Sequence, residues 1–391
     1  MMRILYCQKL RFPNKSAHAL HCALTAANFA AAGAETLFFP GVPFKDALER
    51  GFGLSAFFAG LGYPELPERL RLEAIGTTHK GIYGWMFRRR LGKAASGPGG
   101  VCFASSVKEA GLALDLREKN PACELRVVFE MHHIISRLKE GREAEKLYEL
   151  EKRVFQNADL VIFNSNTLEE SCRDYLPRRG KSLVSPLGYN ERTIRPARDP
   201  AAPEPSIAGG LVNLAYVGSL QAGKGLENLI RALPELGDKY VLDIVGGVPE
   251  RGLYALRQLA AELRLEARVR FAGHLPQAEI ASRLADCDIF VIPMDTEKDF
   301  FAPMKMYEAL GLALPIVATP MPSLRRELAE GENALFAGGC APAALADALK
   351  RLADDPDLRG KMRRHNLAAA RHLSAGRRAE KLLEIFRAPA C

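Results

Sequence analysis

NLAYVGSLQAGKGLENLI, residues 213–230, decides the fold class of this chain. It begins as a near-continuous apolar run, passes through a glycine-rich centre, and ends with apolar residues at helical spacing. Apolar runs without alternation are typical of parallel strands that helices cover on both faces. The segment therefore predicts a strand, a tight turn and a helix, which is the repeating unit of a doubly wound α/β domain.

The same alternation extends in both directions along the chain. Strands are predicted in the first half at 3–7, 36–39, 101–105, 125–131, 160–164 and 182–186, and in the second at 212–218, 240–246, 269–273, 289–293, 315–319 and 334–338. Helical patterns lie between them, among them 16–32, 140–157, 226–236 and 303–312. Two sets of alternating strands and helices predict two Rossmann-like domains, each with a parallel sheet.

A proline-rich junction, PARDPAAPEPSIAGG (196–210), has no apolar periodicity and is typical of a linker. It divides the chain into a first domain (1–195) and a second domain (211–373). Residues 64–100 fit the alternation poorly, and we interpret them as an insertion in the first domain. The segment 374–391 contains a final amphipathic helix over residues 375–386.

Composition excludes several classes of protein. Of 391 residues, 48% are hydrophobic and 26% charged, which are the proportions of globular domains and not of disordered chains. The eight cysteines are scattered singly, without a C-x-x-C pair, and indicate a reducing compartment. The opening apolar run ends after five residues, and no apolar stretch approaches the roughly 18 residues of a spanning helix. We therefore expect a soluble, cytoplasmic protein.

The net charge of +8 belongs entirely to the first domain. Residues 1–195 hold 29 Lys and Arg against 21 Asp and Glu, whereas residues 196–391 hold 25 of each sign. The sequence has no nucleic-acid-binding module, so nucleic acid is not an expected partner. An acidic substrate or a membrane surface remains as the expected partner, and a solvated basic surface is the alternative.

Gly218, Gly223 and Lys224 have the spacing of a phosphate-binding loop, G-x-x-x-x-G-K. The next residue is Gly225, where that motif needs Ser or Thr to hold magnesium, so an NTPase is not indicated. A lysine beside amides at a helix start still suits a diphosphate. The alternative is a glycine turn with a surface lysine.

A second strand–loop–helix junction follows in IFVIPMDTEKDFFAPMKMYEALGLALPIVAT (289–319). Pro303 suits the first turn of a helix, and Lys305 and Glu308 lie one turn apart on it. The helix start offers a second anion site, and a glutamate can accept two hydrogen bonds from a diol such as ribose. The alternative is a solvent-facing Lys–Glu pair.

These segments resemble glycosyltransferase family 4, and the resemblance spans nearly the whole chain in the expected order. In the second half it rests on YVGSLQAGKGLENLIRAL (216–233), VRFAGHLPQAEIASRLADCDIFVIP (269–293), APMKMYEALGLALPIVAT (302–319) and PSLRRELAEGENALFAGG (322–339). In the first half it rests on RILYCQKLRFPNKSAHALHCALTAANFAAAGAE (3–35), FEMHH (129–133), ADLVIFNSNTLEE (158–170) and SPLGYNERTIRP (185–196).

The resemblance implies the GT-B fold and a retaining, metal-independent transfer of a sugar from a nucleotide-diphosphate sugar. The first domain would then bind the acceptor, the second would bind the donor, and the C-terminal helix would pack back on the first domain. By motif position, Lys224 would pair with the diphosphate, the amides near Pro303 and Met304 would cap it, and Glu308 would hold the ribose. The implied donor site comprises Gly218, Ser219, Lys224, Gly273, His274, Pro303, Met304, Lys305 and Glu308, with the backbone of Gly273 and His274 bordering the base.

On the acceptor side, the resemblance implies a loop at Asn14, Lys15 and Ser16, and His132 at the reacting sugar and acceptor. We count His132 with Lys224 and Glu308 as catalytic candidates. The alternative for His132 is a strand-end histidine bonded to backbone.

The chain departs from the family pattern at two positions. Family members often carry two glutamates eight residues apart, and the first of these positions is Phe300 here. The family's arginine after the first-strand glycine is Ser219. Both changes fit a branch with a P-x-K-x-x-E pattern, in which Lys305 supplies the positive charge.

We therefore predict a retaining glycosyltransferase of cell-envelope or surface polysaccharide synthesis. Its expected partners are a nucleotide sugar, a glycan or polyprenyl-diphosphate-linked acceptor, and an anionic membrane that it contacts from the cytoplasmic face. The resemblance implies no cofactor and no metal. We discount the D-x-D at 286–288 as a metal site because it lies before a strand, where acidic residues are ordinary. The alternatives are a catalytically silent nucleotide-sugar-binding subunit and a sugar-nucleotide epimerase of the same fold.

Overall fold

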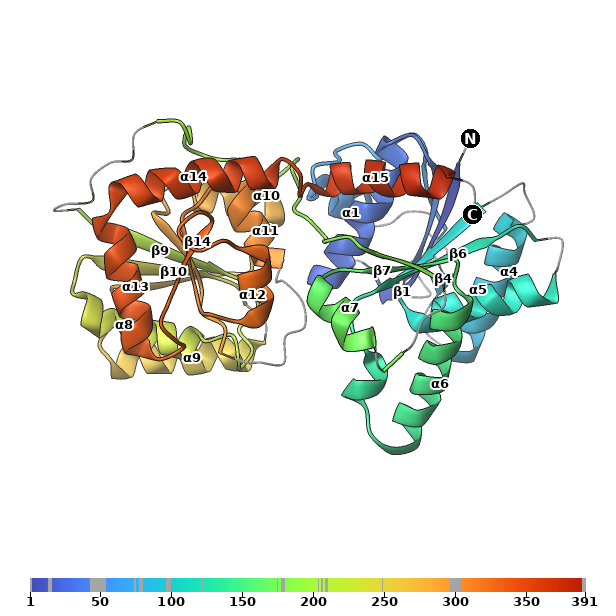
Figure 1. Cartoon of the computed structure of the whole chain (residues 1–391), viewed down its shortest axis with the longest axis horizontal. Coiled ribbons are helices and arrows are strands. Elements are labelled where there is room, and N and C mark those ends of the chain that lie inside the picture. The colour runs from blue at the N-terminus through green and yellow to red at the C-terminus, as the bar shows by residue number, and fades with distance from the viewer. Residues whose placement is uncertain are drawn as a thin grey trace. The chain divides into compact units, whose positions relative to one another are not determined.

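The computed structural model describes residues 2–12, 16–42, 54–73, 75–76, 80–95, 100–120, 123–173, 175–176, 180–202, 204, 207, 210–247, 249–295 and 304–388. The chain forms two compact units, one of residues 1–187 and 375–391 and the other of residues 188–374 (Figure 1). The division falls eight residues before the boundary that the sequence suggested, and it places the proline-rich segment 196–210 within the second unit.

The first unit is a parallel sheet between two layers of helices. Its strands are β1 (Arg3–Arg11), β2 (Glu35–Val42), β3 (Leu70–Leu72), β4 (Ile75–Gly76), β5 (Gly100–Ala104), β6 (Arg126–Met131), β7 (Leu160–Phe163) and β8 (Lys181–Val184). Its helices are α1 (Ala17–Ala31), α3 (Leu54–Ala59), α4 (Lys80–Ala95), α5 (Val107–Lys119), α6 (Gly141–Asn157), α7 (Asn166–Arg173) and α15 (Ala375–Arg387), with a 3-10 turn η1 (Ile135–Leu138).

Its strand order is β3-β2-β1-β5-β6-β7-β8, and β4 also pairs with β2. Successive residues of β1 point to opposite faces, as a strand requires. Ile4 and Tyr6 pack with α1, α3 and α15, whereas Leu5 and Cys7 pack with α4, α5 and α6. The two cores therefore cover both faces of the sheet.

Residues 64–100 are not an appended insertion. They add β3 and β4 to the edge of the sheet beside β2, and α4 buries Phe87 and Leu91 in the core shared with α5. The two strands have three and two residues, too short to leave an apolar signature in the sequence.

The second unit repeats the plan with six parallel strands in the order β11-β10-β9-β12-β13-β14. The strands are β9 (Val212–Val217), β10 (Tyr240–Val245), β11 (Val269–Gly273), β12 (Ile289–Ile292), β13 (Ile316–Ala318) and β14 (Ala334–Phe336). The helices are α8 (Leu226–Leu236), α9 (Glu250–Glu262), α10 (Gln277–Arg283), α11 (Met304–Gly311), α12 (Pro322–Glu327), α13 (Pro342–Asp354) and α14 (Pro356–Ala370).

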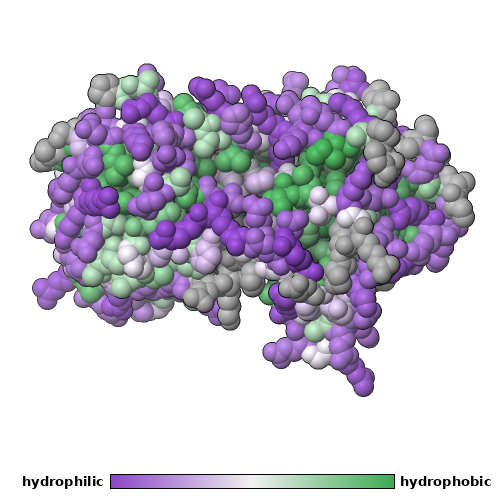
Figure 2. Space-filling view, in the orientation of Figure 1, coloured by the Kyte–Doolittle hydropathy of each residue, from purple (hydrophilic) through white to green (hydrophobic). Residues whose placement is uncertain are grey.

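The C-terminal helix α15 lies along α1 in the first unit (Figure 1). Its residues Ala379, Leu382 and Phe386 belong to the same core as Ile4 and Phe103. On the face shown in Figure 2, the projecting end of α6 carries mostly hydrophilic side chains. Among the described residues, no helix combines the length and the apolar character that crossing a bilayer requires.

Every predicted strand segment contains a strand, and each of the two sheets is parallel throughout its described pairings. The predicted fold class, α/β with two Rossmann-like domains, is confirmed. Seven cysteines lie in the described part of the chain; all seven are free thiols and six are buried.

Candidate functional site

The carboxyl edge of the second sheet brings the predicted donor residues together. The chain leaves β9 on one side toward β10 and returns on the other at β12, so the strand order reverses at β9. Ligands of open α/β sheets bind at this reversal, beyond the carboxyl ends of the strands. The glycine turn after β9 and the end of β12 both belong to this edge.

The turn that carries Lys224 contacts the end of β12 through backbone atoms. Gly225 precedes α8 with φ +73°, and a Cβ on it would lie 1.6 Å from the carbonyl oxygen of Pro293. The amide of Asp295 donates to the carbonyl of Gly223 at 3.4 Å. Because both contacts are made by backbone, the position of Lys224 is coupled to the end of the neighbouring strand.

Lys305, in the first turn of α11, reaches back to β9. Its ammonium lies 3.1 Å from the hydroxyl of Tyr216 and 4.2 Å from the centre of that ring, and the residue is only 7% exposed. A Cβ on Gly218 would lie 3.5 Å from the Lys305 Nζ, and the Tyr216 hydroxyl donates to the carbonyl of Ser219. A cation therefore lies beside the turn where the family has its arginine.

Glu308, one turn further along α11, is the end of a chain of two side-chain hydrogen bonds, from Asn190 to Gln277 and from Gln277 to Glu308, which we call the Gln277 relay. Gln277, the first residue of α10, donates from Nε2 to Glu308 Oε1 at 3.1 Å, and Asn190 donates to Gln277 Oε1 at 2.9 Å. Burial raises the pKa of Glu308, while the Gln277 hydrogen bond and the charge of Lys305 lower it. The relay occupies Oε1, so Oε2 is the oxygen that a ligand hydroxyl would approach.

The sequence offered no sign of the Gln277 relay. Gln277 follows His274 by three residues, within a segment that the family resemblance already marked, but Asn190 is 87 residues away. Only the tertiary structure brings Asn190, Gln277 and Glu308 together.

The end of β11 lies next to the end of β10. Gly273 has φ +71° and its carbonyl accepts from the amide of Gly246 at 2.8 Å. A Cβ on Gly247 would come within 3.2 Å of the His274 amide nitrogen. Backbone therefore lines this side of the edge, as the resemblance implies for the residues that border the base.

The structure describes only some of the remaining predicted positions. Pro303, Phe300, Asn14 and Lys15 lie outside the described residues, and Met304 is the first residue of α11. Ser16 is the N-cap of α1, where its hydroxyl accepts from the amide of Ala19 at 3.2 Å.

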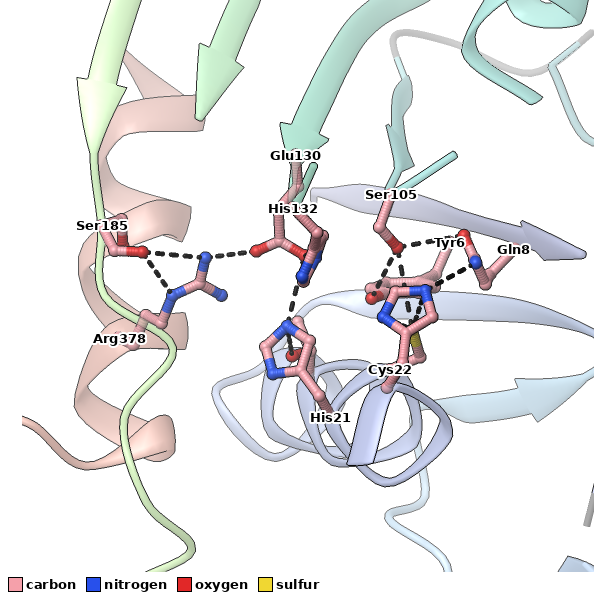
Figure 3. A network of polar contacts seen from close by, with 11 residues as sticks. Tyr6, Gln8, His21, Cys22, Ser105, Glu130, His132, Ser185 and Arg378 are labelled. Carbon is pink, nitrogen blue, oxygen red and sulfur yellow. Dashed lines mark hydrogen bonds and ion pairs between the residues drawn. The ribbon is translucent and has the colours of Figure 1, made fainter. Parts of the chain in front are cut away.

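His132 lies at the end of β6 in the first unit, in a buried cluster of polar side chains (Figure 3). Its Nε2 is 2.9 Å from Oε2 of Glu130, and the same oxygen is 3.2 Å from Nε2 of His21 on α1. The other oxygen of Glu130 accepts from the guanidinium of Arg378 on α15, which also contacts the carbonyl of Ser185. Glu130 is fully buried, and it joins three elements far apart in the sequence.

Electrostatics favour an ionised Glu130 and neutral His21 and His18 imidazoles. Burial alone would raise the pKa of Glu130, but Arg378, His21 and His132 outweigh it and hold that pKa well below its usual range. Burial lowers the pKa of His21. Burial, together with His132 and His21, lowers the pKa of His18 to about 3.

A second set of contacts continues from His18, whose ring centre is 4.8 Å from that of His132. The Nε2 atoms of His18 and Gln8 lie 2.8 Å apart, and the Ser105 hydroxyl donates to Gln8 Oε1 at 3.1 Å. Tyr6 is also within reach of Ser105 (Figure 3). Polar side chains from α1, β1 and the end of β5 therefore form a connected set of contacts next to His132.

The basic cluster at residues 85–90 is partly neutralised. Arg88 lies 3.3 Å from Asp115, and Arg90 lies 3.3 Å from Glu73. Trp85 is 60% exposed and Arg89 stacks on its ring at 5.5 Å. Arg11, Lys15, Arg178 and Arg179 are further basic residues of the first domain that could contact an anionic partner. The side chain of Arg11 is not described, and the other three lie outside the described residues.

A pocket of about 440 Å³ occurs in the second unit at the opposite, amino edge of β9 and β12. Four of the charged side chains that line it are paired, Arg283 with Asp243 and Arg198 with Asp288. Asp288 Oδ2 also accepts from the amide of Asn213 at 2.8 Å, which gives this member of the D-x-D a structural partner. The pocket is remote from the glycine turns and takes no part in the site.

Two parallel-sheet, Rossmann-like domains of this kind define the GT-B class of folds, and solved structures of that class match the whole chain. Sucrose-phosphate synthase of Thermosynechococcus elongatus matches with a TM-score of 0.74 at 17% identity, over 99% of this chain and 98% of that one. HepE of Anabaena, solved in complex with UDP-glucose, matches with a TM-score of 0.70 at 16% identity, over 98% and 99%.

Comparison of the sequence with known protein families gives a more specific match than the fold class. Residues 202–368 match the family model of glycosyl transferases group 1, which covers most of the second unit. The chain is similar to D-inositol 3-phosphate glycosyltransferases, with 32% identity over 236 residues in Streptomyces avermitilis (57% of this chain, 49% of that one). In Corynebacterium urealyticum the identity is 30% over 266 residues (64% and 62%). The chain thus spans about half to three fifths of the length of these relatives.

Proposed function

We propose that this protein is a retaining glycosyltransferase that uses a nucleotide-diphosphate sugar. The observation that carries the proposal is the meeting of three segments at the strand-order reversal of the second unit. The turn at Gly218 lies beside Lys305 at the start of α11, whose Nζ would be 3.5 Å from a Cβ on Gly218. The turn at Lys224 lies against the end of β12, through Gly225 beside the Pro293 carbonyl and the hydrogen bond from Asp295 to Gly223. The group 1 match over residues 202–368 supports the same assignment.

In this proposal the second unit holds the donor. Lys224, with Lys305 beside Gly218, neutralises the diphosphate, and the amides that open α11 near Met304 cap it. Glu308 accepts hydrogen bonds from the ribose hydroxyls through the oxygen that Gln277 leaves open. The backbone at Gly273 and His274 borders the base.

Departure of the leaving group builds negative charge on the diphosphate. Fixed cations and helix amides stabilise that charge without reorganising during the reaction, so the chemistry that we propose uses no metal and no other cofactor. Retention with the departing phosphate acting on the incoming hydroxyl needs no dedicated protein base. His132 positions a hydroxyl of the sugar or the acceptor.

UDP-sugars are the first donors to test, since HepE was solved with UDP and with UDP-glucose. For the acceptor we propose a glycan or a polyprenyl-diphosphate-linked sugar of the cell envelope, reached from the cytoplasmic face of the membrane. The excess positive charge of residues 1–195 supports an anionic acceptor. The names of the curated relatives make inositol phosphate the second acceptor to test.

The test is calorimetric titration of the whole chain with UDP-, GDP-, ADP- and dTDP-sugars, followed by an assay of nucleoside diphosphate release. Lys224→Ala and Glu308→Ala should each reduce turnover about 100-fold, on the order of 3 kcal/mol, because each removes a contact to the charged or hydroxylated part of the donor. Lys361→Ala and Glu235→Ala, exposed in the same unit, are the matched controls.

Three outcomes separate the candidate functions. Diphosphate release that depends on an acceptor supports a transferase, and near-normal turnover in both site variants contradicts the site. Tight donor binding without release indicates a silent binding subunit. Interconversion of the donor sugar without an acceptor indicates an epimerase.

A further inference from the structure

Glu130 is the centre of a contact set that the proposed transfer does not explain. It is fully buried, yet both of its oxygens are occupied by side chains from elements that follow or precede it by more than 100 residues. Oε1 accepts from Arg378, and Oε2 contacts Nε2 of both His21 and His132. Burying these polar and charged side chains costs folding free energy unless each of them has a hydrogen-bond partner, so the geometry of the contacts is specific.

The cluster is electrically balanced when both imidazoles are neutral. Glu130 contributes one negative charge and Arg378 one positive charge. The pKa of Glu130 is held low and that of His21 is lowered, which agrees with this distribution of protons. An ionised carboxylate only accepts hydrogen bonds, so each Nε2 that contacts Oε2 has to carry its hydrogen.

We infer that Glu130 fixes His132 as its Nε2–H tautomer, and that Arg378 and His21 are positioning residues that hold Glu130 for this purpose. In that tautomer the Nδ1 of His132 carries the lone pair, which makes it an acceptor for a hydroxyl. The inference rests on the proposed function only in naming that hydroxyl as one of the bound sugar or of its acceptor.

The same three side chains could be read as a metal site, because ligand atoms of His21, Glu130 and His132 lie within 4.8 Å of one another. The charge distribution argues against this interpretation. A divalent cation would bring two positive charges into a buried cluster that Arg378 already neutralises. Hydrogen bonds from two neutral imidazoles satisfy Oε2 without that cost.

Arg378 is the member of the cluster that comes last along the chain. The chain enters the first unit for the second time at Ala375, and Arg378 lies on the first turn of α15 after that entry. The guanidinium that holds Glu130 therefore comes from the last helix of the described chain, whereas Glu130 and His132 lie 248 and 246 residues earlier.

The experiment uses the whole chain labelled with ¹⁵N-histidine and long-range ¹H–¹⁵N correlation spectra, which distinguish the two imidazole tautomers without any ligand. His132→Asn and His21→Asn assign the signals. We expect both residues as Nε2–H tautomers in the unmodified protein, and a mixture of tautomers at His132 in Glu130→Gln, because a side-chain amide can donate as well as accept.

A double variant that removes both buried charges controls for effects on folding. Glu130→Gln leaves Arg378 buried without a counter-charge, so the double variant Glu130→Gln/Arg378→Met removes both charges. We expect the double variant to recover most of the thermal stability that the single variant loses, while His132 remains a tautomer mixture. Glu151→Gln is the matched control, because Glu151 is buried in the same unit and its hydrogen bonds go to Ser136 and the Ile135 amide.

A second measurement uses UDP and UDP-glucose as probes. Glu130→Gln/Arg378→Met should leave the dissociation constant of UDP unchanged, because UDP binds the second unit, and lower kcat at least 10-fold. An Nδ1–H tautomer in the unmodified protein, an unchanged tautomer in the folded variants, or stoichiometric Co²⁺ binding that Glu130→Gln abolishes would each overturn the inference. Absence of turnover with every donor would contradict the proposed function and leave the tautomer result standing.

Discussion

At the scale of single residues, the edge of the second sheet is built on positions where no side chain fits. A Cβ on Gly246 would lie 2.1 Å from the carbonyl oxygen of Gly218, and one on Gly252 would lie 2.1 Å from that of Leu220. The glycine turn after β9 is therefore pressed against the end of β10 and the start of α9. Its shape is determined by close backbone contacts, with little dependence on the side chains of the turn.

Gly225→Ala should damage this edge more than any change to its surface. The added Cβ meets the Pro293 carbonyl at 1.6 Å and the residue keeps φ +73°, so the turn and the end of β12 have to separate. We expect a loss of unfolding free energy above about 2 kcal/mol and weaker binding of nucleotide. Chemical denaturation and calorimetry measure the two effects.

Gly331→Ala is the control for that experiment. Gly331, in the same unit, has a similar φ of +71°, but a Cβ on it meets nothing within 4 Å. It should cost only about 1 kcal/mol, the strain of a left-handed backbone with a side chain. Equal losses in the two variants would contradict the claim that contact with Pro293 matters.

The hydrogen bond from Gln277 predicts a pH effect on donor binding. Burial raises the pKa of Glu308 and Gln277 lowers it, so Gln277→Ala should raise that pKa further. The ionised carboxylate is the better acceptor for ribose hydroxyls, so affinity falls as the pH drops through the pKa of Glu308. In Gln277→Ala that fall should begin at higher pH.

Titrations of UDP between about pH 5 and pH 8 compare Gln277→Ala with the unmodified protein. Gln258→Ala is the control, because Gln258 is exposed on α9 and its amide donates to Tyr254. Superimposable pH profiles in all three proteins would show that Gln277 does not act through Glu308.

At the scale of helices and strands, local sequence was sufficient for most of the fold. The apolar runs at 212–218 and 240–246 became β9 and β10 within one residue, because a buried parallel strand needs side chains that are apolar on both faces. The runs that became β3 and β4 were too short to show such a pattern.

The candidate sites could be predicted only where their residues are close in sequence. Lys224 follows its glycine turn directly, and Lys305 and Glu308 share one helix, so spacing alone was informative. The partners of His132 could not be found in that way. Arg378 is 248 residues from Glu130, and only the tertiary structure brings α15 to β6.

The helix α15 stabilises the first unit through its apolar face. Leu382 is 1% exposed within the core that α1 and β1 share, so Leu382→Ala should cost about 2–5 kcal/mol of unfolding free energy. Lys381→Ala, exposed on the same helix, should be nearly neutral. Thermal unfolding followed by circular dichroism tests both, and equal stabilities would show that α15 is a dispensable tail.

At the scale of the whole molecule, the two units have one architecture and different charge. Both are parallel α/β sheets, but the positive excess lies within residues 1–195 and the remainder is neutral. The pairing of Arg88 with Asp115 and of Arg90 with Glu73 reduces the part of that excess available to a partner at residues 85–90. Trp85 and Arg89 are the exposed members that remain there.

We expect the whole chain to bind vesicles of anionic phosphatidylglycerol, and to bind them more weakly as salt increases. Trp85→Ala/Arg89→Ala should weaken binding by about 1 kcal/mol for the lost cation, with a further loss for the aromatic ring. Arg231→Ala, exposed in the second unit, is the control. Co-sedimentation that is absent or insensitive to salt would contradict a membrane contact.

The return of α15 to α1 has a consequence for how the protein is made. The ribosome synthesises β1 to β8 before the second unit, and it adds α15 (Ala375–Arg387) after the second unit. While the second unit is being synthesised, the first unit therefore lacks one of its core helices. During that interval Ile4, Phe29 and Phe103 lack the neighbours that α15 supplies, and Glu130 lacks Arg378. The half of the chain that is translated first is therefore the half that completes its folding last.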